Sequence, residues 1–405
     1  MRRIAIIGGG PAGSMAAEVL ARGGGTVTIY EEKLWWEKPC GGGLTHKVLQ
    51  RYPFLRAATT PVNYVREMEI IEPKGLSERF NLPQPVAIYA RTALNHLLFE
   101  RALEAGVRAV QDRIVDIKPV GGKWRLGGRQ GSYQCDYVIL ATGTGSLTRR
   151  RLAVDLPAQD YVLTLGYYVP GGRDEPLRIR FFEDYEGYAW AFPRTDHVAV
   201  GIGGRCGQYR MGDLRDRLHR FMSECGYSTE RATVHSHLLP SLRSCSWGSV
   251  TLAGPNWAMV GDAAGLVDPV TGEGIAYAMR SGELAARSLL SPAQGSYSEL
   301  LWNEFGRTLA NSARLLPHFY RGSALGRSIP TMMVELIGHS ARFQRLVTDL
   351  VADWPFLESL GARVCLNVAA SLGDVMLGPL REALRQATSS RYVSDHFETS
   401  LRARE

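Results

Sequence analysis

The first apolar run of the chain, residues 4–7, is followed by a cluster of glycines and then by the helical spacing of Ser14–Arg22. A second apolar run, Thr26–Tyr30, follows that helix. Unbroken apolar runs of this length are typical of parallel strands that are buried on both faces. The pattern therefore predicts a strand–helix–strand unit at the N-terminus.

Two further apolar runs lie far along the chain. Residues 137–140 lead into an Ala-Thr-Gly segment, and residues 257–260 lead into a Gly-Asp segment. Both have the composition of buried strands. Residues 64–90 and 156–247 alternate with period two instead, which is typical of an antiparallel sheet, and one helix is expected near Gly212–Cys225.

The chain after Pro292 is predicted to be mainly helical. Apolar residues recur at helical spacing in Ser298–Leu316, Thr331–Leu350 and Pro355–Gly373. Packing of these helices on the sheet is the simpler explanation of their apolar faces. A partly exposed apolar groove for lipid contact is the alternative.

Composition narrows the classes of protein that fit this pattern. The chain has 405 residues, a net charge of +7 and six cysteines without a CxxC pair, which argues against a dithiol redox centre and a metal knuckle. The basic balance suits an anionic cofactor, an anionic substrate, a membrane surface or simply a solvated surface. No stripe of basic and aromatic residues suggests nucleic acid.

Location is predicted from what the sequence contains near its start and along its length. The chain begins directly with a strand, and no apolar segment is long enough to span a membrane. We expect a cytoplasmic protein with free thiols, with peripheral contact at the inner face of the membrane as the alternative.

The N-terminal glycines have the spacing of a dinucleotide-binding loop. Gly8, Gly10 and Gly13 fill the pattern G-x-G-x-x-G between the first strand and its helix. The first glycine makes a tight turn, the second admits a pyrophosphate, and the third lets the helix lie close to the strand. Glu31 ends the next strand, where it can accept hydrogen bonds from a ribose.

The Gly-Asp segment offers a second set of groups for the same ligand. Gly261 lets the backbone approach a ligand closely, and the Asp262 carboxylate can accept hydrogen bonds from sugar hydroxyls. Gly272 and Gly274 precede a helical pattern over Ile275–Leu290. The first N–H groups of that helix are unpaired and point at whatever lies before it.

These two stretches together resemble the flavoprotein superfamily that includes p-hydroxybenzoate hydroxylase. A narrower resemblance, to the geranylgeranyl reductase family, is carried by three runs: residues 261–275, Lys38–Leu44 and Tyr188–Pro193. The matches extend from residue 4 to about residue 290. The resemblance implies bound FAD, with the N-terminal glycines on the pyrophosphate and the Gly-Asp segment on the ribityl chain and the isoalloxazine ring.

The expected fold is therefore an α/β fold of the p-hydroxybenzoate hydroxylase-like type. It has a Rossmann-like FAD-binding domain, a discontinuous antiparallel-sheet substrate domain and a C-terminal helical region. The boundaries that we predict are 1–63, 91–155 and 248–291 for the FAD-binding domain, 64–90 and 156–247 for the substrate domain, and 292–405 for the helical region.

The resemblance also implies the residues that hold the cofactor. It places Cys40 beside the flavin ring, Arg91 at the start of a helix near a phosphate or ribose, and the Ala-Thr-Gly segment near the adenine half. The predicted FAD-binding residues are Gly8, Gly10, Pro11, Ala12, Gly13, Glu31, Glu32, Cys40, Gly41, Gly42, Arg91, Ala141, Thr142, Gly143, Gly261, Asp262, Pro269, Gly272, Gly274 and Ile275.

An aromatic strand is the candidate wall of the substrate site. With period two, Tyr188, Trp190 and Phe192 share one face, and two alanines share the other. The run Tyr188–Pro193 resembles the Y-x-W-x-F-P pattern of the family, although Tyr185 stands where the family has a proline. Burial of the three rings in a core is the alternative to a substrate pocket.

The function implied is an FAD-dependent oxidoreductase acting on CH–CH bonds. It would saturate double bonds of an isoprenoid, either a geranylgeranyl-type diphosphate, a lipid or a quinone tail, by hydride from reduced flavin and a proton. Cys40, Tyr188 and Trp190 are the predicted catalytic residues. NADPH, a ferredoxin or a quinol would each fit as the reductant, so an electron-donor protein is a candidate partner.

Three alternatives stay open from the sequence. A flavin monooxygenase and a flavin halogenase share the superfamily, and halogenases also rely on a lysine, for which Lys74 in a turn is the best-placed candidate. A non-enzymatic prenyl-binding carrier is the third alternative. A metal site is not predicted, because His235 and His237 lack a third ligand at suitable spacing.

Overall fold

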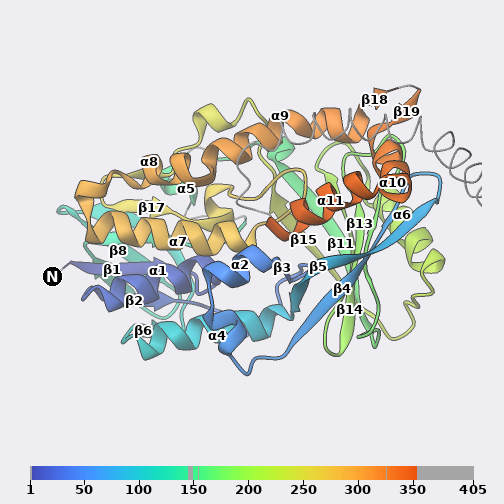
Figure 1. Ribbon diagram of the computed structural model, residues 1–405. Coiled ribbons are helices and arrows are strands. Elements are labelled where there is room, and N and C mark those ends of the chain that lie inside the picture. Colours follow the sequence, from blue (N-terminus) through green and yellow to red (C-terminus); the bar gives the residue numbers. More distant parts are fainter. Residues whose placement is uncertain (1, 145–148, 154, 325, 354–405) are drawn as a thin grey trace, which may run out of the picture.

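The computed structural model describes residues 2–144, 149–153, 155–324 and 326–353. Two large sheets stand at opposite ends of the molecule, and helices run along both (Figure 1). The N-terminus lies at the end that carries the first sheet. The predicted helix Pro355–Gly373 lies outside the described residues.

The first sheet brings together the apolar runs that the sequence scatters over 250 residues. β1 pairs in parallel with β2 on one side and with β10 on the other, and β10 pairs in parallel with β17. The order of its six strands is β16-β17-β10-β1-β2-β6. Their bounds are β1 Arg3–Ile7, β2 Thr26–Tyr30, β6 Arg108–Val110, β10 Tyr137–Leu140, β16 Ala253–Gly254 and β17 Trp257–Met259.

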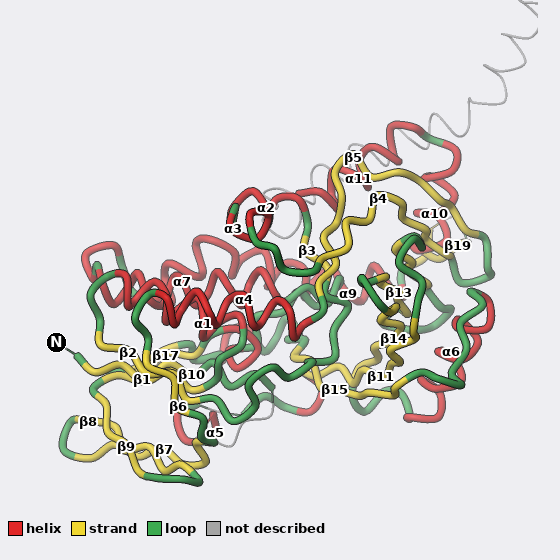
Figure 2. Tube along the Cα trace, turned by 90° about the horizontal axis from the view of Figure 1, so that it is seen from below, coloured by secondary structure: helices red, strands yellow, loops and turns green. Residues whose placement is uncertain are grey.

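Helices α1 (Pro11–Arg22), α4 (Arg91–Glu104) and α7 (Ile275–Leu290) pack beside this sheet (Figures 1 and 2). α1 begins at Pro11 rather than at the predicted Ser14, because proline is well suited to the first turn of a helix. A three-stranded meander of β7 (Ile114–Val120), β8 (Lys123–Gly128) and β9 (Ser132–Cys135) is joined to the same end.

The second sheet has eight strands in the order β15-β11-β14-β13-β12-β4-β5-β3, and all its neighbours are antiparallel except β12 and β4. It includes Gly43–Leu44, inside the range predicted for the FAD-binding domain, because these residues pair with β5. The bounds are β3 Gly43–Leu44, β4 Val62–Ile71, β5 Ser77–Tyr89, β11 Tyr161–Pro170, β12 Leu177–Arg180, β13 Ala189–Pro193, β14 His197–Arg205 and β15 Thr233–Pro240.

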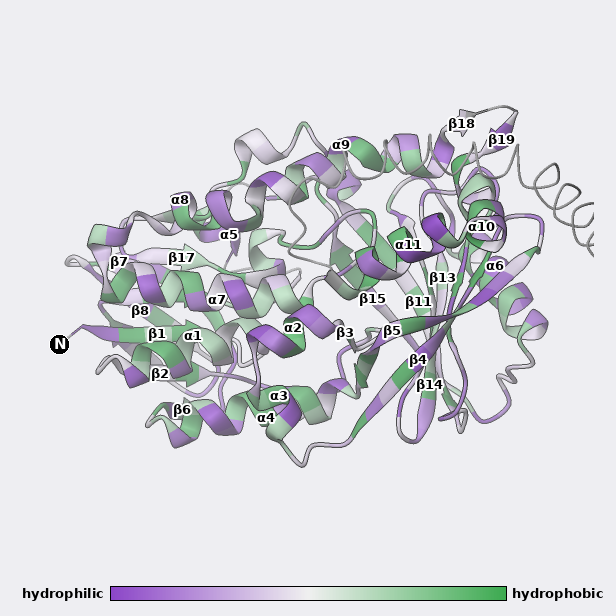
Figure 3. Cartoon of the chain, viewed as in Figure 1, coloured by the Kyte–Doolittle hydropathy of each residue, from purple (hydrophilic) through white to green (hydrophobic). Residues whose placement is uncertain are grey.

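Helices cover both faces of the second sheet. The apolar face of α6 (Met211–Glu224) packs on the side that carries the β13 alanines. α9 (Arg307–Arg321), α10 (Ile329–His339) and α11 (Ala341–Asp353) pack on the other side. Figure 3 shows hydrophobic and hydrophilic bands alternating along α9, as expected for a helix with one buried face.

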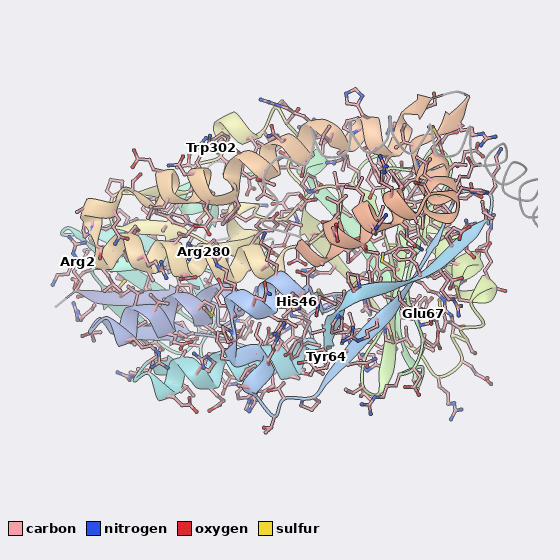
Figure 4. All side chains as sticks on the ribbon, viewed as in Figure 1. Arg2, His46, Tyr64, Glu67, Arg280 and Trp302 are labelled. Carbon is pink, nitrogen blue, oxygen red and sulfur yellow. The ribbon has the colours of Figure 1, made fainter. Side chains whose placement is uncertain are left out.

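One buried arginine joins α7 to the turn that precedes α9, and the remaining elements are short. Arg280 of α7, labelled in Figure 4, pairs with Glu304, which lies in a π-helical turn between α8 and α9. No helix in the described part is long and apolar enough to cross a membrane. The short elements are α2 His46–Arg51, α3 Phe54–Ala57, α5 Arg149–Leu152, α8 Tyr297–Leu301, β18 Ser323–Ala324 and β19 Arg327–Ser328.

The contact between α1 and α7 provides a test of this architecture. A Cβ atom on Gly282 would lie 2.1 Å from the Ala12 carbonyl oxygen, so Gly282→Val must push the two helices apart. We expect a loss of at least about 3 kcal/mol in the free energy of unfolding, measured by denaturation, together with loss of flavin. Gly212→Ala in α6 is the control, because no heavy atom lies within 4 Å of its added Cβ. An unchanged stability of Gly282→Val would contradict the packing.

Candidate active site

A cavity of about 640 Å³ lies between the two sheets. The carboxyl ends of β1, β2, β10 and β17 open into it from one side, and β15 and the loop over residues 32–40 close it from the other. Ligands of open parallel sheets bind at such an edge. All the predicted cofactor residues line this cavity except Gly13, Gly41, Gly42 and Pro269.

The glycine loop after β1 is built from close backbone contacts. Gly8 has a φ of +107°, and a Cβ atom there would lie 2.3 Å from the Ala141 carbonyl oxygen. A Cβ atom on Gly13 would lie 2.0 Å from the Gly8 carbonyl oxygen, which is why Gly13 faces the strand and not the cavity. Gly10 has open space where its side chain would be, so the backbone at the start of α1 is accessible to a phosphate.

The end of the cavity beside β2 carries the acids that follow this strand. One oxygen of Glu31 accepts from the Gly9 amide at 2.7 Å and the other from the Lys33 amide at 2.8 Å. Glu32 forms ion pairs with Arg129 at 2.8 Å and Arg113 at 3.4 Å. The Glu31 carboxylate is thereby held in one orientation at the cavity wall, where its remaining lone pairs can accept from ribose hydroxyls.

The Gly-Asp segment lies at the opposite end. Gly261 has a φ of +60°, and its Cα is wedged between Ala12 of α1 and Ala278 of α7. The Asp262 carboxylate forms an ion pair with the Lys38 ammonium, and both side chains are largely buried. Burial opposes ionisation of Asp262, but the charge and hydrogen bond of Lys38, together with Arg91 and His237, outweigh it, so the pKa of Asp262 is lowered and the carboxylate is charged.

Arg91 supplies an unsatisfied donor to the cavity. Arg91 is only 4% exposed. Its Nη2 donates to the Asn95 side chain at 3.3 Å, and its buried Nε has no partner. A buried guanidinium N–H without an acceptor is costly, and a phosphate or a sugar oxygen would satisfy it. This orphaned donor, the open Gly10 and the carboxylates of Glu31 and Asp262 together fit FAD.

The turn before α7 completes this end of the site. Gly272 and Gly274 line the cavity, whereas Pro269 is buried in the turn behind them. The Glu273 carboxyl accepts from the Ala276 amide at 2.8 Å and so caps α7. Burial raises the pKa of Glu273 to about 7.

The aromatic strand β13 lies between two loops of the cavity wall. A Cβ atom on Gly41 would come 2.5 Å from the Phe192 ring, so Gly41 faces this ring rather than the cavity. Gly42 likewise packs on backbone, with 2.0 Å between an added Cβ and the Tyr89 carbonyl oxygen. At the other end of the strand, the Tyr188 hydroxyl donates to the Thr271 carbonyl.

The rings of β13 point to the side covered by α9–α11. Tyr188 and Phe192 pack on the apolar cluster formed with these helices, and Trp190 is half-buried beside Tyr188 with 6.0 Å between ring centroids. The alternating alanines, Ala189 and Ala191, are fully buried against the α6 side. The two faces of β13 therefore have different neighbours.

Sequence reasoning missed several residues that the fold brings here. Lys38 lies inside the run that carries the family resemblance, and Arg194 follows the aromatic run directly. The position of each beside a matched run is the signal in the sequence that points to it. His237 lines the cavity next to the Trp36 ring, with its Nε2 buried and unpartnered. Burial lowers the pKa of His237 to about 4, so this imidazole is neutral. Within the described residues no three ligands are grouped to hold a metal.

Comparisons with known proteins agree with this geometry. The profile of the pyridine nucleotide-disulphide oxidoreductase family matches residues 2–169. The chain is 28% identical to geranylgeranyl diphosphate reductase of Synechocystis over 71% of the chain and 75% of the relative. It is also 28% identical to menaquinone reductase of Mycobacterium tuberculosis, over 87% of the chain and 93% of the relative.

Solved structures confirm the fold. A geranylgeranyl bacteriochlorophyll reductase-like protein from Thermoplasma acidophilum superposes with a TM-score of 0.72 at 20% identity, covering 94% of this chain and 98% of that one. A flavin-dependent brominase superposes with a TM-score of 0.70 at 18% identity, covering 93% and 99%.

The fold and its cavity define an FAD-dependent oxidoreductase with the p-hydroxybenzoate hydroxylase-like α/β fold, as predicted. Within that class the chain is similar to geranylgeranyl diphosphate reductases and menaquinone reductases, at up to 28% identity.

The role proposed for Asp262 can be tested by flavin content. Asp262→Ala removes a charged acceptor and leaves Lys38 buried without its partner. Loss of one charge-assisted hydrogen bond corresponds to about 1.5–3 kcal/mol, so we expect roughly 10- to 100-fold weaker FAD binding in a flavin titration. Asp174→Ala, at an exposed turn, should bind FAD like the parent. Full flavin occupancy of Asp262→Ala would move the ribityl contact elsewhere.

The raised pKa of Glu273 predicts a pH-dependent stability. The folded state keeps the Glu273 proton in a pH range where the unfolded chain releases it, so this contribution is present at low pH and is lost as the pH rises through about 7. A Gln at this position still accepts from the Ala276 amide and cannot ionise. We expect Glu273→Gln to melt with the parent near about pH 5 and above it near about pH 8. If the melting temperatures of Glu273→Gln and the parent differ by the same amount at both pH values, Glu273 is not buried.

Proposed function

We propose that this protein saturates carbon–carbon double bonds of an isoprenoid chain, carried by a diphosphate, a lipid or a quinone. The observation that carries the proposal is the position of β13, whose rings stand between the Cys40 loop and the turn before α7. Both loops line the cofactor cavity, so a chain lying along the rings would reach the flavin end of the cavity. The names of the relatives support an isoprenoid substrate.

The chemistry of such a bond suits this wall. An unactivated trisubstituted alkene is not polarised, so one carbon must receive a hydride and the other a proton as the π bond is lost. Reduced FAD supplies the hydride when it is bound. Positive charge that develops on the tertiary carbon is stabilised over an aromatic face, and the Trp190 ring is the face that we propose for this role.

The proton is assigned by elimination between the two candidate donors. Burial raises the pKa of Tyr188 above its usual range, and its hydroxyl proton is already donated to Thr271. Tyr188 is therefore a ring and an anchor rather than an acid. Cys40 is left as the candidate, with its sulfur held 3.4 Å from the Gly42 amide in the loop that contacts Phe192.

The halogenase alternative draws on fold similarity alone. Lys74, the lysine considered for it, is exposed in the turn between β4 and β5, and that turn does not line the cavity. Lys38 does line the cavity, but its ammonium is paired with Asp262. The prenyl-carrier alternative gives no role to the unpartnered Arg91 donor or to the open backbone at Gly10.

Substrate and reductant are tested together by anaerobic turnover. Protein reduced with dithionite is incubated with geranylgeranyl diphosphate, menaquinone or a prenylated lipid. Any quinol formed is reoxidised in air, and the products are then examined by mass spectrometry for pairs of hydrogens added to the isoprenoid chain. Parallel samples receive NADPH, reduced ferredoxin or a quinol in place of dithionite. Failure to reduce any of the three isoprenoids with dithionite would contradict the proposal.

Trp190 separates a substrate wall from an ordinary core. If its ring walls the slot, Trp190→Ala should keep its flavin and its melting temperature while turnover falls more than about tenfold, because apolar contact and cation–π stabilisation are lost. If the ring is core, the cavity left behind costs roughly 3–5 kcal/mol and lowers the melting temperature. Trp302→Ala is the control, since Trp302 is 42% exposed on the outer helices (Figure 4). A lower melting temperature of Trp190→Ala with normal turnover per bound flavin would contradict the substrate wall and place the ring in the core.

A further inference from the structure

Arg194 is the largest side chain in the described part of the chain that is fully buried. It follows the aromatic strand directly, and its guanidinium reaches into the Cys40 loop. Nη1 donates to Glu37 Oε1 at 2.5 Å, and Nη2 donates to the Cys40 carbonyl oxygen at 2.7 Å. One planar group thus holds two points of that loop.

Glu37 extends the same contact into the flavin-binding part. Its carboxylate accepts from the backbone amides of Arg91 at 2.9 Å and Thr92 at 2.8 Å, which are the first amides of α4. Burial opposes ionisation of Glu37, but Arg194 and the two amides of α4 together outweigh burial, and the pKa of Glu37 is lowered. The carboxylate therefore stays charged at the N-terminus of the helix that carries Arg91.

The surroundings of Arg194 fix its orientation. Its guanidinium lies over the Tyr168 ring at 5.2 Å, and Nη1 also contacts His197 Nε2 at 3.1 Å. His197 in turn contacts Asp196 at 2.8 Å. Because Arg194 only donates, His197 accepts at Nε2, and its Nδ1–H donates to the Asp196 carboxylate. Burial lowers the pKa of His197, which keeps this imidazole neutral.

We propose that Glu37 and Arg194 are a positioning pair that fixes the Cys40 loop and the start of α4 against the end of β13. The pair joins three segments that each carry a proposed site residue: Cys40, Arg91 and Phe192. This inference rests on the proposed function for its effect on turnover, but its geometry does not depend on the substrate. Neither residue lines the cavity.

A stabilising role alone does not account for this arrangement. Desolvation offsets most of the attraction within a buried ion pair, so such a pair adds little net stability over apolar residues of similar volume. What the pair provides is defined geometry, because each of the two residues holds backbone groups of other segments. Misplacement of a reacting group by about 1 Å can lower a rate about 100-fold.

The test compares two replacements of Arg194. Arg194→Met removes charge and both hydrogen bonds, whereas Arg194→Lys keeps the charge beside Glu37 but lacks the fork that reaches the Cys40 carbonyl at the same time. For Arg194→Lys we expect a melting temperature near that of the parent, about 100-fold lower kcat with little change in KM, and a changed rate of Cys40 alkylation by iodoacetamide. Peptide mass spectrometry separates Cys40 from the other cysteines.

Arg178→Lys is the matched control. Arg178 lies in the same sheet and pairs with Glu69 at 2.8 Å, but neither residue lines the cavity. Its replacement should leave Cys40 alkylation and kcat unchanged. Glu37→Gln should change the Cys40 alkylation rate in the same direction as Arg194→Lys, and we expect both variants to change the visible spectrum of bound flavin.

The outcomes separate the two proposals. If Arg194→Lys has the melting temperature, the kcat and the Cys40 alkylation rate of the parent, the positioning role is wrong. If Arg194→Met fails to fold, the Arg194→Lys and Glu37→Gln comparison still decides the question. If the parent itself reduces no isoprenoid, the proposed function fails, while the alkylation rate and the flavin spectrum continue to test the pair.

Discussion

The cavity depends on backbone approaches that only glycine allows. Gly13 lies against the Gly8 carbonyl, Gly261 is wedged between α1 and α7, and Gly282 meets the Ala12 carbonyl. These contacts bring β1, α1 and α7 close enough for one cavity wall to be shared by segments 250 residues apart. Side chains at these points would separate the helices, and the glycine loop after β1 and the Gly-Asp segment would no longer line one cavity.

Much of this framework follows from the sequence, because it rests on short-range patterns. Apolar runs mark the parallel strands, glycine spacing marks the loop after β1, and the glycines before Ile275 mark the start of α7. The faces of β13 follow from period two. The pairing of Gly43–Leu44 with β5 does not follow from the sequence, since two residues give no periodicity and their pairing is set by tertiary contact.

The ion pairs of the site could not be predicted in the same way. Lys38 meets Asp262 across 224 positions, and Arg194 meets Glu37 across 157. A charged residue in a loop carries no local pattern that distinguishes a buried partner from solvent. Which pairs form depends on how the two sheets sit against each other, and that placement is decided by the packing of α1, α7 and the Cys40 loop.

The two ends of β13 are held by different parts of the cavity wall. Arg194 binds the Cys40 loop at one end, and Tyr188 binds the Thr271 carbonyl at the other. Tyr320 of α9 donates to the neighbouring Val270 carbonyl at 2.7 Å, so the same turn is anchored to the helices that cover the rings. Hydride transfer requires reacting atoms about 3–3.5 Å apart. Under the proposed function, a strand tied at both ends to loops of the cavity wall would hold a substrate carbon on Trp190 at a fixed distance from bound FAD, which an isolated aromatic wall could not do.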